Sequence, residues 1–358
     1  MSGAVPFGLV YVIPLTLVLG LVWGGAWTFS TAILIFVITP VLDAIIGLRE
    51  DPPDADDRGA WLYESWIVLW PPVQIALMIA VFWAIAIKGT SPLETAGLLL
   101  SLGILSGGGG INIAHEFMHR SSLFARGTAE VLMTLATYPH FCVEHILGHH
   151  RNVATPLDPA SARRGESVYP FLLRTIWGGL RSAWRLEGQR VAKRNLRPFG
   201  WQDRRLRHPL LVLGLYGATF WAFGTVGVMA LFVQSAIAVG LLEVINYVEH
   251  YGLQRTQTPN GRFERVQPKH SWNSAHRLSG WYLFNLPRHA DHHYEARRTY
   301  RELRHLQDSP QLPMGYPTMV LMALVPPLWF WVMNGRVDAW NGAQSEHSSA
   351  ASEAVAAT

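Results

Sequence analysis

The sequence has little charge and almost no cysteine. Only 15% of its 358 residues are charged, whereas 50% are hydrophobic; an average soluble domain has roughly 25% charged residues. Cys142 is the sole cysteine, which excludes an internal disulfide and, without a CxxC pair, a built-in rubredoxin or iron–sulfur module. The composition therefore indicates a membrane protein, and any electrons that it uses must come from a separate partner.

The N-terminus also lacks the basic segment and the cleavage site of a signal peptide. Its apolar stretch runs on into a second one, so we expect the first span to be retained. The net charge of +4 would suggest nucleic acid in a soluble protein, but basic residues of membrane proteins usually face the cytoplasm and the lipid headgroups. We therefore expect no nucleic-acid partner.

Six stretches are apolar enough to cross a bilayer as helices, which takes about 20 residues each. Short gaps pair them into three hairpins, so both termini are expected on one side. Of the 29 Lys and Arg residues, only Lys88 lies in a loop on the far side, which places the long segments 115–207 and 249–312 in the cytoplasm. The predicted spans are 7–24, 27–48, 65–87, 92–114, 208–225 and 227–248.

These features predict an all-α integral membrane protein with a single domain over 1–340. A bacterial-type inner (cytoplasmic) membrane is the expected location. The apolar stretch 316–333 is interrupted by Pro326-Pro327, which favours an interfacial helix over a seventh span. Residues 341–358, rich in Ala and Ser, are predicted to form a disordered tail.

Histidines follow the cytoplasmic ends of the predicted spans in groups with metal-ligand spacing. His115 and His119 stand at i and i+4, on one helix face and about 6 Å apart. His145 and His149 repeat this spacing, and His150 points about 100° away. An adjacent pair of this kind can serve two metals.

A third group contains His289, with His292 or His293 on the same helix face, and His250 ends the sixth span. Any one histidine could be a hydrogen-bonded core residue, and a lone HExxH motif is weak evidence. Three groups at the same membrane depth instead indicate a metal site, because ionisable groups near a bilayer are costly unless they serve a function.

Nine imidazoles exceed the four ligands of a tetrahedral zinc site, so we expect two metals with four or five ligands each. Imidazole also suits zinc, copper and nickel. The high coordination number favours iron over these metals.

Carboxylates beside the ligand histidines are expected to accept imidazole N–H groups and orient the rings. Direct ligation and solvent-facing ion pairs are the alternatives. His140 and His276 could contribute in the same way or be structural. The four carboxylates are Glu116, Glu144, Glu249 and Asp291.

Four segments resemble the membrane alkane monooxygenases, which are relatives of the membrane fatty-acid desaturases. The resemblance covers about 27–303, and NYVEHYGL distinguishes the alkane monooxygenases from the desaturases. The matching segments are HEFMHR (115–120), EHILGHHRNVATPLDPASARRGES (144–167), NYVEHYGL (246–253) and WNSAHRLSGWYLFNLPRHADHH (272–293).

The resemblance implies a six-helix membrane fold, a di-iron centre, and terminal hydroxylation of alkanes with O2 and electrons from rubredoxin and rubredoxin reductase. Two departures from the family pattern are Arg120 in place of lysine and Pro287 in place of glutamine, and the second puts the substrate range in doubt. Carried over by position, the iron ligands are His115, His119, His145, His149, His150, His250, His289, His292 and His293.

A hydrocarbon has no polar group that a protein could bind, so we expect an apolar channel that admits it from the lipid phase. Trp23, Trp27 and Phe29 could cap this channel, with anchoring at the membrane interface as the alternative. Basic cytoplasmic residues could dock an acidic electron donor or bind membrane lipids. These residues are Arg163, Arg164, Arg297, Arg298 and Arg301.

Three other functions fit part of the pattern. A membrane fatty-acyl desaturase or hydroxylase would share the metal site. An intramembrane zinc protease would need only HExxH, a distant third ligand and Glu116 as base, which leaves the other histidine groups unexplained. A metal transporter would hold its histidines at mid-membrane, whereas these cluster at the ends of the spans.

Overall fold

The computed structural model describes residues 3–51, 59–258 and 260–356, and it consists of helices and connecting loops. Five helical segments of this described part are long and apolar enough to cross a membrane, and the count rises to six if one bent pair of helices near the C-terminus forms a single span. The five segments are Val5–Trp23, Gly25–Ile46, Ala60–Gly89, Pro92–Met118 and Arg204–His250. The first four lie over the first four predicted spans.

These four segments are composites in which α-helices continue through short 3-10 or π-helical turns. Their α-helical parts are α1 (Val12–Trp23), α2 (Ser30–Ile33), α3 (Thr39–Ile46), α4 (Ala60–Val68), α5 (Trp70–Trp83), α6 (Pro92–Ile104) and α7 (Asn112–Met118).

Two hairpin turns are joined at one end of the bundle. α6 begins with a capping box between Ser91 and Glu94, and Pro92 occupies the first turn, where its missing N–H is not needed. Oε2 of Glu94 serves the capping box, and its other carboxylate oxygen, Oε1, accepts a hydrogen bond from the backbone N–H of Gly25 at 2.8 Å. The turn between α1 and α2 therefore lies beside the turn that precedes α6, as the predicted hairpins require.

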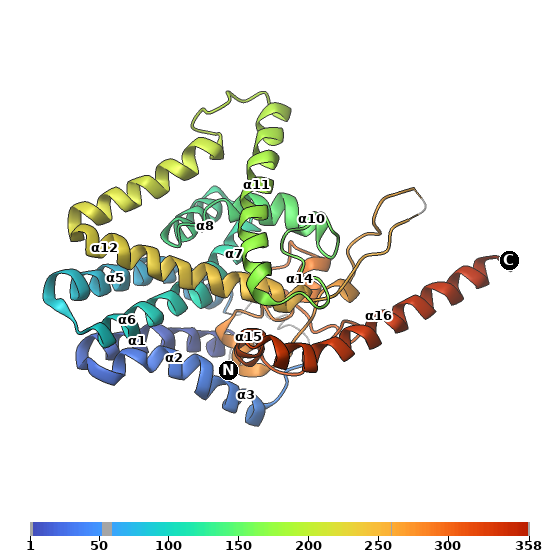
Figure 1. Ribbon diagram of the computed structural model, residues 1–358, viewed down its shortest axis with the longest axis horizontal. Helices are drawn as coiled ribbons and strands as arrows, with labels where there is room; N and C mark the ends of the chain where they lie inside the picture. Colours follow the sequence, from blue (N-terminus) through green and yellow to red (C-terminus); the bar gives the residue numbers. More distant parts are fainter. Residues whose placement is uncertain (1–2, 52–58, 259, 357–358) are drawn as a thin grey trace.

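The fifth segment, α12 (Arg204–His250), reverses direction at Gly224. The dihedral angles of Gly224 are φ 63° and ψ −159°, close to the 65° and −160° of Gly24, where α1 ends. Glycine adopts this positive φ without a Cβ clash. The two arms, 204–223 and 225–250, form a V (Figure 1) and correspond to the predicted spans 208–225 and 227–248.

Further helices lie between and after the spans, most of them within the predicted cytoplasmic segments. α10, α14 and α15 gather at the end of the bundle opposite the hairpin turns, and α11 runs across the direction of the spans (Figure 1). Their bounds are α8 (Leu123–Leu135), α9 (Phe141–Glu144), α10 (His150–Asn152), α11 (Val168–Lys193), α13 (Arg277–Tyr282) and α14 (His289–Tyr294).

The last two helices, α15 (Tyr316–Ala323) and α16 (Pro326–Ala356), meet at a bend of 118°. The break falls at the predicted double proline, which cannot continue the hydrogen-bond ladder of α15. α16 then runs on to Ala356, so the segment predicted as a disordered tail is helical over 341–356, in keeping with the high helix propensity of its alanines. Residues 357–358 lie outside the described residues.

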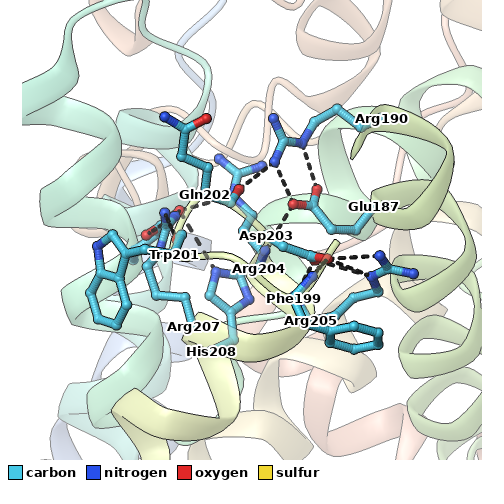
Figure 2. A network of polar contacts seen from close by, with 11 residues as sticks. Glu187, Arg190, Phe199, Trp201, Gln202, Asp203, Arg204, Arg205, Arg207 and His208 are labelled. Carbon is cyan, nitrogen blue, oxygen red and sulfur yellow. Dashed lines mark hydrogen bonds and ion pairs between the residues drawn. The ribbon is translucent and has the colours of Figure 1, made fainter. Parts of the chain in front are cut away.

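A polar network holds the connection between α11 and α12, residues 194–203, which we call the elbow (Figure 2). The buried Glu187 accepts hydrogen bonds from Arg190 Nε at 2.7 Å and from the backbone N–H of Arg204 at 2.9 Å. Asp203 caps α12, and the hydrogen bond from Arg205 lowers the pKa of Asp203 to about 2. The network at the elbow therefore contains two ionised, buried carboxylates, each neutralised by arginine.

Candidate metal centre

The nine predicted ligand histidines meet at the end of the bundle opposite the hairpin turns. They come from four places in the chain, each at or near the end of a span or in a short helix beside it. α7 and its C-cap supply His115 and His119, the turn between α9 and α10 supplies His145, His149 and His150, the end of α12 supplies His250, and α14 supplies His289, His292 and His293.

The nine rings form two clusters, in each of which one candidate ligand atom per residue lies within 4.8 Å of all the others. We name them by their size. The five-histidine cluster contains His115, His119, His145, His150 and His292, and the four-histidine cluster contains His149, His250, His289 and His293.

The pairing of residues within the clusters differs from the one expected from α-helical spacing. His145–His149 is a π-helical turn, in which hydrogen bonds run from i to i+5. His145 therefore joins His150 in one cluster, and His149 belongs to the other. The adjacent histidines His149 and His150 are divided between the two clusters, as the sequence suggested, and so are His292 and His293.

Nitrogen atoms in each cluster converge at close range. His145 Nε2 lies 3.1 Å from His119 Nε2 and 3.0 Å from His150 Nε2. In the four-histidine cluster, His289 Nε2 lies 3.2 Å from His250 Nε2. Two lone pairs at this distance repel unless a proton or a cation lies between them. Metal–nitrogen bonds of about 2.1 Å at right angles place neighbouring nitrogens about 3 Å apart, so this spacing fits a metal ion.

Nitrogen atoms without a hydrogen-bond partner and the neutral state of the rings also indicate metal binding. The buried Nε2 atoms of His115, His149 and His293 have no hydrogen-bond partner among the described residues. Burial, together with the neighbouring rings, lowers the pKa values of His145 and His292 well below their ordinary range. These imidazoles stay neutral at physiological pH, which is the state that binds metal.

A carboxylate that the sequence analysis did not single out holds one ligand. Asp158 Oδ2 lies 2.9 Å from His149 Nδ1 and also accepts a hydrogen bond from Ser161 at 2.6 Å. Burial favours the neutral acid, but the facing His149 ring and the Ser161 hydroxyl outweigh it and hold the pKa of Asp158 below its usual value. Asp158 thus fixes the ring so that Nε2 faces the cluster.

Of the four carboxylates predicted to orient ligand histidines, Glu249 lies close to one, at the ring nitrogen that faces the cluster. Its Oε2 lies 3.2 Å from His289 Nε2, and its Oε1 accepts a hydrogen bond from the Tyr316 hydroxyl at 2.9 Å. The Oε1 atom of Glu144 is buried without a hydrogen-bond partner among the described residues.

Glu116 and Asp291 hold the ligand helices from outside instead. Glu116 accepts hydrogen bonds from Arg120 at 2.8 Å and from the backbone N–H of Tyr300 at 3.1 Å. Asp291 binds Arg298 at 2.6 Å and Arg304 at 2.8 Å. Both carboxylates therefore bind arginines and not the histidines that are next to them in the sequence. The spacing of the residues in the sequence does not reveal this choice of partner.

His140 and His276 belong to neither cluster. His140 packs against the ring of Tyr138, with 4.2 Å between centroids, and His276 Nδ1 forms a hydrogen bond with Ser274 at 2.9 Å. Two of the arginines predicted to dock an electron donor are engaged within the chain, Arg298 with Asp291 and Arg164 with Asp338.

An apolar cavity ends at the metal centre. His115, His145 and His289 form part of its wall, together with Glu249. Its apolar residues come from the first, second and fourth spans, α9, the second arm of α12, α13 and the segment after it, and α15. They include Ile13, Phe36, Ile104, Leu241, Ile245, Leu286 and Val320.

The predicted gating residues do not line this cavity. Trp23 and Trp27 are 57% and 52% exposed and pack edge to face at the turn after α1; Phe29 follows in the same turn region. This turn lies at the end of the bundle opposite the metal centre, and that these residues cap the channel stays a prediction. Pro287 also lies outside the cavity wall, although its neighbour Leu286 is part of it.

Replacing Asp158 with Asn should loosen the His149 ring and weaken metal binding about 10- to 100-fold, the usual cost of losing such a partner. Metal retained after dialysis against a graded series of chelator concentrations measures this loss. Asp338→Asn is the matched control, because Asp338 forms a salt bridge with Arg164 at the surface. Equal retention by both variants would show that Asp158 does not support the metal site.

Comparisons with known proteins agree with this site. The fatty acid desaturase family model matches residues 92–322. The chain is 42% identical to alkane 1-monooxygenase 1 of Pseudomonas aeruginosa, covering 88% of this chain and 84% of that one, and 37% identical to alkane 1-monooxygenase of Ectopseudomonas oleovorans, covering 90% and 78%. It is 28% identical to the xylene/toluene monooxygenase hydroxylase component of Pseudomonas putida, covering 89% and 86%. The chain belongs to the fatty acid desaturase family and, within it, to the alkane 1-monooxygenases.

Proposed function

We propose that this chain is a non-haem di-iron monooxygenase that hydroxylates the terminal carbon of an alkane, using O2 and electrons from rubredoxin. The observation that carries the proposal is the apolar cavity, one end of which is walled by His115 and His145 of one cluster and His289 of the other. A substrate in this cavity meets both clusters at once. The names of the relatives, alkane 1-monooxygenases, agree with an alkane substrate.

The five-histidine and four-histidine clusters would each hold one iron ion. When bound, the iron pair supplies the activation of O2 that a saturated hydrocarbon needs. The overall reaction converts RH, O2, two electrons and two protons into ROH and H2O. The protein supplies no covalent partner to the substrate; its residues position the reactants and control which of them reach the metals.

The cavity binds substrate by shape and by excluding water. Burying one methylene group contributes about 0.8 kcal/mol, so an alkane gains affinity from its length alone. Polar groups occur at the metal end of the wall, where Asn112 and Glu249 lie beside the histidines. A chain buried in the apolar part therefore presents its end, and not its middle, to the metal centre.

The zinc protease alternative is not supported by the surroundings of Glu116. The base of such an enzyme must face a metal-bound water, whereas Glu116 binds Arg120 and the backbone of Tyr300 and is not part of the cavity wall. The acyl desaturase or hydroxylase alternative shares the cavity and the clusters, so only the products of the reaction separate it from alkane hydroxylation.

We further propose a location in the bacterial inner membrane with both termini in the cytoplasm. η1 (Val5–Tyr11), the first described element, packs on α13, and α16 ends the chain, both toward the end of the bundle that carries the histidines (Figure 1). Rubredoxin, reduced by rubredoxin reductase, would then reach the metal centre from the cytoplasm.

The first prediction from this proposal is metal content. Protein purified without chelators should hold close to two irons per chain, and stoichiometric zinc in their place would rule out the oxygenase. His149→Ala and His292→Ala each remove one ligand from a different cluster and should each lower the iron content towards one. His276→Ala, outside both clusters, should leave it unchanged.

The second prediction is the product. Membranes containing this chain, supplied with rubredoxin, its reductase and NADH, should convert linear alkanes to 1-alkanols. Branched and aromatic hydrocarbons and fatty-acyl substrates should be offered in parallel. Unsaturated acyl products without alkanols would replace alkane hydroxylation with desaturation.

A run of four glycines shapes the cavity. A Cβ atom on Gly109 would collide with Trp70, one on Gly110 with Gln74, and one on Gly107 would press on the second arm of α12. These three glycines therefore allow close helix packing. A Cβ atom on Gly108 would meet nothing within 4 Å, and Gly108 is part of the cavity wall.

Gly108→Leu should therefore fill part of the cavity and shift the preference to shorter alkanes. Each methylene group that no longer fits costs about 0.8 kcal/mol of binding, roughly a fourfold loss of apparent affinity. Competition between alkanes of different lengths measures the shift. Gly217→Leu, also with open space at its Cβ position but outside the cavity wall, is the control, and identical chain-length profiles for the two variants would contradict the role of Gly108.

A further inference from the structure

Three cavities follow one another from the surface to the metal centre. The outer cavity opens between α11 and the first arm of α12, at the elbow of Figure 2. Most of its wall is apolar, and its polar side chains include Glu187, His208 and His140. The inner cavity is about the size of one water molecule. The third is the apolar cavity described above. The inner cavity is lined mainly by Tyr138, His140, Glu144, Thr175, Gly179 and Glu243.

Neighbouring cavities share wall residues. His140 lines both the outer and the inner cavity. Asn246 and Phe141 line both the inner and the apolar cavity. The inner cavity thus shares one wall residue with the outer cavity and two with the apolar cavity, whose wall includes histidines of both clusters.

The inner cavity is lined by polar atoms that water could bind. His140 Nε2 and Glu144 Oε1 are buried without a hydrogen-bond partner among the described residues. Buried polar atoms usually find such partners, often in an ordered water. A cavity of this size, with two unpartnered polar atoms in its wall, meets the conditions for a bound water.

Glu243 lies at the inner end of the series, in the wall of the inner cavity. Its buried carboxylate accepts hydrogen bonds from the Tyr138 hydroxyl at 2.9 Å, the Thr175 hydroxyl at 2.9 Å and Asn246 Nδ2 at 3.0 Å. No arginine, lysine or histidine forms a salt bridge with it among the described residues. Three donors therefore hold the Glu243 carboxyl group in a fixed position beside the inner cavity.

We propose that the inner cavity holds a water molecule and that His140, this water and Glu243 deliver protons from the outer cavity to the metal centre. The inference rests on the proposed function, because hydroxylation consumes two protons per turnover. The hydrocarbon would fill the apolar cavity during turnover, so the protons need a separate way in.

The proton steps balance atom by atom. His140 keeps part of its surface exposed, so a ring nitrogen takes a proton from water in the outer cavity, and the buried Nε2 gives one to the inner water. That water would pass the proton on beside Asn246 towards the metal centre, with the Glu243 carboxyl group next to the path, and the iron pair, when bound, would supply the reduction of O2 that consumes the proton. Two such deliveries, with two electrons from rubredoxin, complete the water molecule that leaves with the alcohol.

Gly179→Ala is the variant that tests the water directly. The added methyl group would lie 3.9 Å from Glu144 Cγ and 4.0 Å from the Tyr138 hydroxyl oxygen, which is ordinary van der Waals contact. It would therefore occupy the inner cavity without a clash, and alanine is favoured over glycine within a helix. Gly214→Ala, an exposed helical position with open space around its Cβ, is the matched control.

X-ray radiolytic labelling reads out the water in protein without metal. Radicals form from bound water, so Tyr138, only 5% exposed, should be labelled in the unchanged chain and in Gly214→Ala. Its labelling should fall severalfold in Gly179→Ala, whereas the exposed Tyr294 serves as an internal reference. An unlabelled Tyr138, or equal labelling in Gly179→Ala, would overturn the bound water.

Turnover of the iron-loaded enzyme tests the relay. Gly179→Ala and Glu243→Gln should slow hydroxylation several-fold and raise the solvent deuterium isotope effect, because proton delivery becomes limiting. A merely structural defect would lower the rate without changing the isotope effect, and that outcome would overturn the relay. If the unchanged chain hydroxylates no alkane, the proposed function fails by itself, and the labelling result still decides whether the inner cavity holds water.

Discussion

The convergence of nine imidazole rings in a buried volume is the constraint on which the rest of the structure depends. Neutral nitrogens about 3 Å apart, such as His145 Nε2 and His150 Nε2, repel one another, so the folded chain must hold them together by other means. It does so with partners on the outside of the site. Asp158 binds His149, Asp291 ties α14 to Arg298 and Arg304, and Glu116 joins α7 to the segment at Tyr300. Metal binding then relieves a repulsion that these contacts maintain.

The same constraint accounts for the irregular helices beside the site. A regular α-helix would bring His145 and His149 to one face, but each is needed in a different cluster. The π-helical turn over His145–His149 rotates the faces so that His145 and His150 serve one cluster and His149 the other. π-turns often mark functional sites in helices. Another π-helical segment, Leu105–Ile111, contains the four glycines beside the apolar cavity.

Much of this arrangement could be predicted from the sequence. Spans follow from continuous apolar stretches, and the nine ligands follow from histidine spacing at the span ends together with the family resemblance. Features that depend on contacts between distant segments could not be predicted. Asp158 is not at a helical spacing from His149 and contacts it only because the loop between them folds back. Glu116 and Asp291 are close to histidines in the sequence, but in the structure they bind arginines. The cavity wall likewise depends on how the spans pack. The sequence alone therefore did not reveal that Trp23 and Trp27 are not among the residues that line the cavity.

Hydroxylation of a hydrocarbon places two opposite demands on one site. The substrate needs a dry, apolar wall, while the reduction of O2 needs protons from water. In the structure, the apolar and the polar residues approach the metal centre from different directions. The apolar wall approaches the clusters from between the spans, through residues such as Ile104 and Leu241, whereas polar groups approach from the elbow of α11 and α12, through His140 and Glu243. Asn246 stands at the boundary, since it lines the apolar cavity and also donates a hydrogen bond to Glu243. A single turn of α12, from Glu243 to Asn246, is therefore where the dry and the polar sides of the site meet.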